Sequence, residues 1–164
     1  MALIYISVGS NTNREYHVRQ GVKALRQHLG ELQVSSVYES ESVGFSGDSF
    51  YNLVVGATTE LSIMQCKTLF KQIEDDYGRD RSAERFSGRT LDLDLLTYDA
   101  LICQQPVQLP RAEITENAFV LWPLAEIAPQ QIHPLTQQTY AELWRNYTKK
   151  QKLWPVPFDW SDSL

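Results

Sequence analysis

The residues best suited to chemistry lie together in one stretch, residues 79–94, which reads RDRSAERFSGRTLDLD. This stretch holds four of the fifteen basic residues of the chain, namely Arg79, Arg81, Arg85 and Arg89. It ends on two aspartates, Asp92 and Asp94. On a β-strand, residues i and i+2 point to the same face and lie about 6.5–7 Å apart, so both carboxylates would face one side. The intervening leucines would then point into a core.

Paired carboxylates beside several arginines have two interpretations. Mg²⁺ prefers oxygen ligands and is usually held by one or two carboxylates together with substrate phosphates. Guanidinium groups donate bidentate hydrogen bonds that suit phosphate oxygens. A metal pair with a set of arginines is therefore typical of phosphoryl transfer. The other interpretation is a structural network of ion pairs, and these residues alone leave both open.

The hydrophobic pattern around this stretch predicts the elements that would position it. Apolar residues recur at helical spacing over 14–29 and 63–77, and each segment is preceded by a possible capping box, at Thr12–Glu15 and Ser62–Gln65. We expect strands over 3–8, 32–40, 50–60, 91–98 and 101–109. Beyond them we expect a short helix and then an extended segment within 113–127, and a short helix over 140–147.

Two strands between two helices are the split βαβ order of ferredoxin-like folds. The fold class we expect is α+β, with a ferredoxin-like βαββαβ core and a mixed, mostly antiparallel sheet with helices packed on it. No repeat or linker divides the chain, so we expect one domain over residues 1–164, with an irregular tail over 148–164.

Composition narrows the class of protein. The 164 residues are 43% hydrophobic, enough for a core, and the net charge of −5 disfavours a general binder of nucleic acid or membrane surfaces. No apolar run approaches a membrane span, and the first five residues contain no basic region of a signal peptide, so we expect a cytoplasmic protein.

Cys66 and Cys103 make no zinc motif, and we expect His17 and His28 at the surface.

The motif Arg-x-Arg-x-x-x-Arg-x-x-x-Arg-Thr-Leu-Asp-Leu-Asp resembles the signature of the 6-hydroxymethyl-7,8-dihydropterin pyrophosphokinase family of folate biosynthesis. Supporting pieces occur in the family's order: Gly9-Ser10-Asn11, Val43-Gly44, Phe50-Tyr51-Asn52, Glu74, Phe119 to Leu124, and Glu126 to Pro129. The resemblance covers roughly residues 3–130. It implies transfer of the terminal diphosphate of ATP to the hydroxymethyl oxygen of the pterin, leaving AMP.

The resemblance also implies roles for individual residues. Asp92 and Asp94 would bind two Mg²⁺ ions, Arg79 and Arg89 would bind the triphosphate, and Arg81 and Arg85 would lie on a loop that closes over the site. Further residues implied at the nucleotide are Lys71, Glu74 and Arg111. The implied pterin pocket consists of Phe50 and Phe119 as stacking faces, Asn52 at the pterin edge, and Ser40 and Val43 as lining.

The chain departs from the family pattern at several positions. It has Glu41-Ser42 in place of Pro-Pro, Ser87-Gly88 in place of Gly-Pro, Arg111-Ala112 in place of His-Tyr, and Asn117 in place of a basic residue. Arg111, Ala112 and Asn117 replace residues that flank the nucleotide in the family, and Ser87-Gly88 should loosen the loop before Arg89. We therefore expect ordinary pterin recognition, weaker ATP binding and slow diphosphate transfer.

Three functions follow as hypotheses. The first is a monomeric, Mg²⁺-dependent pyrophosphokinase that binds a pterin and ATP. The second is a catalytically weakened paralogue that binds a pterin or nucleotide in a regulatory role. The third is an RNA-binding ferredoxin-like module, which the net charge of −5 and the paired aspartates disfavour.

Overall fold

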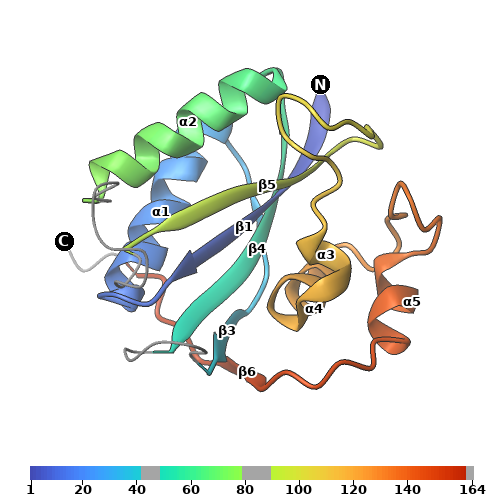
Figure 1. The fold of residues 1–164 in the computed structure, drawn as a ribbon. Helices are drawn as coiled ribbons and strands as arrows, with labels where there is room; N and C mark the ends of the chain where they lie inside the picture. The colour runs from blue at the N-terminus through green and yellow to red at the C-terminus, as the bar shows by residue number, and fades with distance from the viewer. Residues whose placement is uncertain (42–48, 79–89, 162–164) are drawn as a thin grey trace.

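A six-stranded antiparallel sheet organises the chain (Figure 1). The structure is a computed structural model that describes residues 1–41, 49–78 and 90–161. Its elements in chain order are β1 (Ala2–Ser10), α1 (Arg14–Leu29), β2 (Gln33–Val34), β3 (Val37–Ser40), β4 (Phe50–Thr59), α2 (Ile63–Asp76), β5 (Asp92–Tyr98), α3 (Glu113–Glu116), α4 (Ala118–Ile127), α5 (Tyr140–Arg145) and β6 (Leu153–Val156).

The strands lie in the order β5-β1-β4-β3-β6, and β2 also pairs with β4. Every pairing among the described strands is antiparallel. The first helix connects β1 to the strands beside β4, and the second connects β4 to β5, as in a split βαβ arrangement. The predicted α+β class with a ferredoxin-like core is confirmed.

Each face of the sheet is covered by its own helices, α1 and α2 on one and α3, α4 and α5 on the other (Figure 1). Alternation along β1 explains both layers, because Ile4, Ile6 and Val8 pack under α1 and α2 while Tyr5 packs with α4. The same alternation on β5 sends Leu93 and Leu95 toward α2. Asp92, Asp94 and Leu96 face the α4 side.

The two predicted capping boxes have different outcomes. At α2 the prediction is confirmed, since Ser62 Oγ accepts from Gln65 N at 3.1 Å and Gln65 Oε1 accepts from Ser62 N at 2.8 Å. At α1 it is wrong, because the helix begins after Asn13, whose φ of 44° is left-handed and whose side chain makes no cap. Asparagine tolerates this conformation, so the turn forms there.

His17 is buried, which corrects the expectation that it lies at the surface, whereas His28 is exposed as expected. The cause is the turn that precedes α1, where the carbonyl of Thr12 is 2.6 Å from His17 Nδ1 and accepts a hydrogen bond from it. The edges of Tyr16 and Tyr77 pack against the ring.

The region after β5 differs most from prediction. The expected strand over 101–109 is reduced to one isolated bridge between Cys103 and Leu109. The expected extended segment within 113–127 is helix α4, which is apolar on nearly every side and buried. A continuous apolar run has no periodicity that separates a buried strand from a buried helix. Within the expected tail, β6 pairs with β3.

Among the described residues, the helices are too short or too polar to cross a bilayer.

Candidate active site

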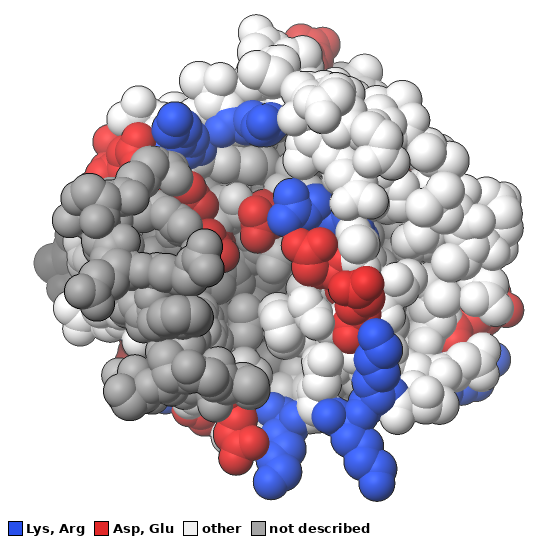
Figure 2. All heavy atoms as spheres, in the orientation of Figure 1, with Lys and Arg blue, Asp and Glu red and all other residues white. Residues whose placement is uncertain are grey.

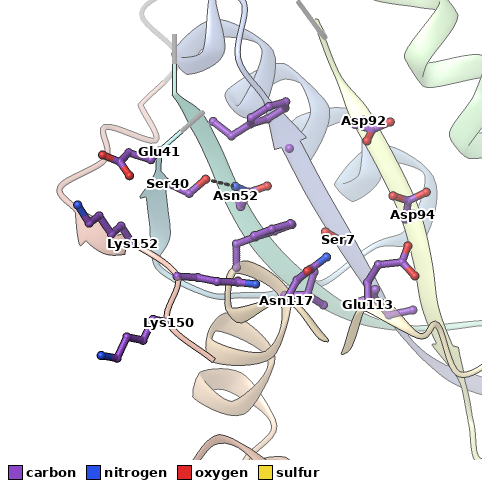
Figure 3. Close-up of a pocket in the computed structure, with 16 residues that line it drawn as sticks. Ser7, Ser40, Glu41, Asn52, Asp92, Asp94, Glu113, Asn117, Lys150 and Lys152 are labelled. Atoms are coloured by element: carbon purple, nitrogen blue, oxygen red, sulfur yellow. Dashed lines mark hydrogen bonds between the residues drawn. The ribbon is translucent and has the colours of Figure 1, made fainter. Parts of the chain in front are cut away.

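A pocket of about 630 Å³ opens on the α4 side of the sheet. Figure 2 shows the surface hollowed near its centre, with acidic groups along one side and lysines below. Strands β1, β4 and β5 provide its base, and the start of α4 and the C-terminal segment provide its walls (Figure 3). The pocket has two chemically different ends.

The acidic end is built on β5. Asp92 and Asp94 both line the pocket, as the two-residue period predicts. In the sheet register Asp94 is opposite Ser7 and Asp92 is opposite Gly9 of β1. Both side chains are half-buried and project toward the cavity in Figure 3.

Glu74 supports this end from behind. It comes from the last turn of α2, is buried, and accepts a hydrogen bond from the Leu93 backbone N–H at 2.8 Å. Because β5 is at the edge of the sheet, that N–H has no strand partner. Glu74 therefore holds the backbone between the two aspartates and does not itself line the pocket.

The electrostatics of this end favour an added cation. Burial and the neighbouring carboxylate of Asp92 raise the pKa of Asp94 from 3.8 to about 6, and Glu74 and Glu113 add to the rise. The Arg111 guanidinium opposes it from 3.8 Å, but it also binds Glu113 at 2.8 Å. Within the part of the chain that the structure describes, the Arg111 guanidinium thus faces two carboxylates, those of Asp94 and Glu113.

A magnesium ion fits this donor set. No group of three or more His, Cys, Asp or Glu side chains within the described ranges could enclose a metal ion. An ion at Asp92 and Asp94 would thus complete its shell with oxygens of substrate or water. That is the usual arrangement for Mg²⁺, which keeps several waters and binds one or two carboxylates with phosphate oxygens.

The aromatic end is built from β3, β4 and α4. Phe50 begins β4 and Phe119 is the second residue of α4, and both are half-buried and line the pocket. Between them, buried Asn52 donates from Nδ2 to Ser40 Oγ at 3.2 Å (Figure 3). Gly9 makes room for Asn52, because a Cβ there would lie 2.9 Å from Asn52 Oδ1. Two rings and one oriented amide suit a flat ligand with a polar edge.

The structure brings together Ser40, Phe50, Asn52, Asp92, Asp94 and Phe119 of the residues predicted for the site. Lys71 is exposed on α2 and does not line the pocket. Arg111 does not line the pocket either, but its guanidinium contacts the carboxylates of Asp94 and Glu113. Five predicted residues lie outside the described residues: Val43, Arg79, Arg81, Arg85 and Arg89.

Sequence reasoning missed several residues that line the pocket. Lys150, Gln151 and Lys152 come from the C-terminal segment, which carries no motif and offered no signal. Ser7 could have been found from strand alternation alone, since it lies two residues before Gly9 on the same face of β1. Glu41 and Asn117, noted above as departures, also line the pocket.

Comparisons with known proteins agree with this geometry. The profile of the 7,8-dihydro-6-hydroxymethylpterin-pyrophosphokinase (HPPK) family matches residues 5–129. A Bacillus subtilis protein named 2-amino-4-hydroxy-6-hydroxymethyldihydropteridine pyrophosphokinase is 38% identical over 133 residues, which are 78% of this chain and 79% of that protein. A protein of the same name from Aquifex aeolicus is 30% identical, over 92% of this chain and 95% of that protein.

Solved structures show the same fold. The crystal structure of Plasmodium falciparum HPPK-DHPS matches with a TM-score of 0.71 at 13% identity, over 90% of this chain. This chain spans 44% of that longer one. On the family profile and the identities to curated relatives, the chain belongs to the 7,8-dihydro-6-hydroxymethylpterin-pyrophosphokinase family.

Proposed function

We propose that the protein transfers the terminal diphosphate of ATP to the hydroxymethyl group of 6-hydroxymethyl-7,8-dihydropterin, with Mg²⁺, and releases AMP. One observation carries the proposal beyond family membership. A single pocket has paired carboxylates on β5 at one end and two half-buried phenyl rings with an oriented amide at the other. A Mg²⁺–triphosphate and a flat heterocycle would be bound side by side there.

In this reaction the pterin hydroxyl oxygen attacks the β-phosphorus of ATP, and the bond from that phosphorus to the α-phosphate oxygen breaks. Phe50 and Phe119 hold the ring system by stacking, and Asn52 binds its edge. Asp92 and Asp94 would hold two Mg²⁺ ions, which would supply positive charge beside the transferred diphosphate. Catalysis is then mainly positioning and electrostatic stabilisation.

The remaining site residues take roles by family resemblance. Arg79 and Arg89 bind the triphosphate, Arg81 and Arg85 cover it, and Val43 completes the pterin pocket. For Glu74 the hydrogen bond to Leu93 supports an indirect role, through the backbone of β5. For Arg111 the contacts with Asp94 and Glu113 support a role in balancing charge around the nucleotide. Lys71, exposed on α2, would contact the nucleotide from outside the pocket.

The proposal includes a single-domain, monomeric, cytoplasmic enzyme that binds a pterin and ATP and not nucleic acid. The weakened regulatory paralogue is not favoured, because the curated relatives at 30–38% identity are named as pyrophosphokinases. The RNA-binding module gains no support either, since the family profile and the curated relatives are those of pyrophosphokinases.

The test is an assay of AMP release by the purified chain with ATP, Mg²⁺ and 6-hydroxymethyl-7,8-dihydropterin. We expect one AMP for each pterin diphosphate formed, and no release with a chelator or with 6-methyl-7,8-dihydropterin, which lacks the attacking hydroxyl. AMP release that does not depend on the hydroxymethyl group would contradict the proposal, as would turnover no faster than that of an Asp92→Asn, Asp94→Asn double variant.

A further inference from the structure

The C-terminal segment from Tyr147 to Lys152 forms part of the pocket wall, although it lies outside the 5–129 range of the family profile. In Figure 3, Lys150 and Lys152 lie on the side of the pocket near Ser40 and Glu41, away from Asp92 and Asp94. Gln151 lies between the two lysines in sequence and also lines the pocket. Its side chain also forms hydrogen bonds to the start of α4.

Gln151 binds the junction between α3 and α4 with both ends of its carboxamide. Its Oε1 accepts from the Ala118 N–H at 2.7 Å, and its Nε2 donates to the Glu116 carbonyl at 3.3 Å. Ala118 is the first residue of α4, and the first N–H groups of a helix have no partner within the helix. Asn117, at the N-cap position, makes no side-chain cap. Gln151 therefore supplies the cap from a distant part of the chain.

The segment before Gln151 is anchored to the same helices. Trp144 of α5 stacks on Trp122 of α4 with ring centroids 5.1 Å apart, and Tyr147 stacks on Trp144 at 5.5 Å. The Tyr147 hydroxyl donates to the Glu116 carbonyl at 2.6 Å. These contacts bring the chain to the start of α4 in a defined position, so Gln151 need not order a free tail to form its hydrogen bonds.

The segment after Gln151 is anchored to the opposite wall. The Lys152 carbonyl accepts from the Glu41 N–H at 3.3 Å, and Leu153 pairs with Ser40 of β3. Ser40 and Phe119 thus belong to two walls that are joined by consecutive residues of the C-terminal segment. Phe119 follows Ala118 directly, so the hydrogen bond from Ala118 fixes the backbone that carries this ring.

We propose that Gln151 is a positioning residue of the pterin slot, which acts through the Ala118 N–H to hold Phe119 at a fixed distance from the β3–β4 wall. The inference rests on the proposed function, in which Phe119 stacks on the pterin. Stacking depends on the spacing of the two rings, because dispersion attraction falls steeply when a gap of 0.5–1 Å opens. Loss of the Gln151 hydrogen bond should therefore weaken pterin binding and leave the acidic end unchanged.

The test compares three variants of the full chain with the parent: Gln151→Ala, Gln151→Glu and Thr148→Ala. Gln151→Glu keeps an acceptor oxygen for the Ala118 N–H, where the N-terminal end of a helix favours negative charge, but it loses the Nε2 donor to the Glu116 carbonyl. Thr148→Ala is the matched control, because Thr148 is exposed on the same segment and does not line the pocket. The readouts are the KM for pterin, the KM for ATP, kcat, and the exchange rate of the Ala118 amide proton.

For Gln151→Ala we expect the KM for pterin to rise about fivefold, the effect of one hydrogen bond, with the KM for ATP and kcat within about twofold of the parent. The Ala118 amide should exchange faster. Thr148→Ala should match the parent in the KM for pterin, and Gln151→Glu, which loses the donor to the Glu116 carbonyl but keeps an acceptor for the Ala118 N–H, should lie between the parent and Gln151→Ala. Together these results would separate positioning from a merely structural cap.

Three results would overturn the inference: an unchanged KM for pterin in Gln151→Ala, an equal rise in both KM values, or a Thr148→Ala variant as weak as Gln151→Ala. Each of these leaves the proposed function intact if the parent still forms AMP and pterin diphosphate. A parent that neither binds pterin nor releases AMP would overturn the proposed function and this inference with it.

Discussion

The two ends of the pocket are built in different ways. The acidic end depends on two aspartates separated by one residue on a single strand, with Glu74 holding the backbone between them. The aromatic end combines β3, β4, α4 and the C-terminal segment, which meet only in the folded protein.

The two ends also differ in how they affect the stability of the folded protein. The acidic end places carboxylates close together in a partly buried setting, and burial and the Asp92 carboxylate raise the pKa of Asp94. The aromatic end consists of packed rings and paired hydrogen bonds, which stabilise the fold whether or not a ligand is present. Substitutions of Asp92 and Asp94 should therefore affect catalysis more than stability, and those of the two rings should affect affinity for one substrate.

The largest effect is expected for Asp92→Asn and Asp94→Asn. Each should lower kcat/KM by about 100-fold or more, because metal-ion stabilisation of the transferred group amounts to several kcal/mol and tenfold in rate corresponds to about 1.4 kcal/mol. Pterin affinity, measured by calorimetry without nucleotide, should stay within about twofold. Glu60→Gln, a change of charge at an exposed position outside the pocket, is the control. Parent-like Mg²⁺–ATP binding in either aspartate variant would show that the metal site lies elsewhere.

The second effect concerns the rings. Phe119→Ala and Phe50→Ala should each weaken pterin binding by about 1–3 kcal/mol, by analogy with base–aromatic stacking, with a much smaller effect on ATP. Phe158→Ala is a matched aromatic control, because Phe158 packs against Tyr51 and Trp160 and does not line the pocket. If ATP and pterin affinities fell together in the Phe119 variant, the two ends would not be separate sites.

The third effect is on stability. Glu74→Ala should lower the free energy of unfolding by about 1–3 kcal/mol, because it leaves the buried Leu93 N–H without an acceptor. Glu74→Gln keeps an acceptor oxygen, so its free energy of unfolding should fall by less. Urea unfolding followed by circular dichroism measures the free energy of unfolding of both variants. Equal losses for Ala and Gln would indicate that the charge of Glu74, and not its hydrogen bond, supports β5.

The smallest effect is the dependence of stability on pH without metal. The pKa of Asp94 is raised to about 6 in the folded state, so the folded protein holds this proton more tightly than the unfolded chain does. Stability should fall as pH rises from about 4 to about 6, and Asp94→Asn should remove that loss. The gain in the free energy of unfolding of Asp94→Asn over the parent should be full above pH 6 and absent below pH 4. It should stay under about 1 kcal/mol, because solvent screens the partly exposed Asp94 side chain.

Thermal unfolding of the parent and of Asp94→Asn, in magnesium-free buffer at pH 4, 5, 6 and 7, measures this difference. A gain that did not change across this range would mean that the effect comes from packing and not from ionisation.

Local patterns were sufficient for several features. The period of two on β5 predicted that Asp92 and Asp94 share a face, and the hydroxyl of Ser62 with the amide of Gln65 predicted the start of α2. The pattern of two strands between two helices predicted the fold class. These features depend on neighbours within one turn or one strand, where backbone geometry alone fixes which side chains can meet.

Other features needed the tertiary structure. The run from Ala118 to Ile127 is apolar throughout, so only its burial between the sheet and α5 decided that it is a helix. The pairing of β6 with β3 and the hydrogen bond from Ala118 to Gln151 depend on the path of the chain between distant segments. The sequence by itself determined which residues could carry the chemistry and how the aspartates are spaced. The structure decided which other walls meet them, because long-range contacts form only when whole elements pack together.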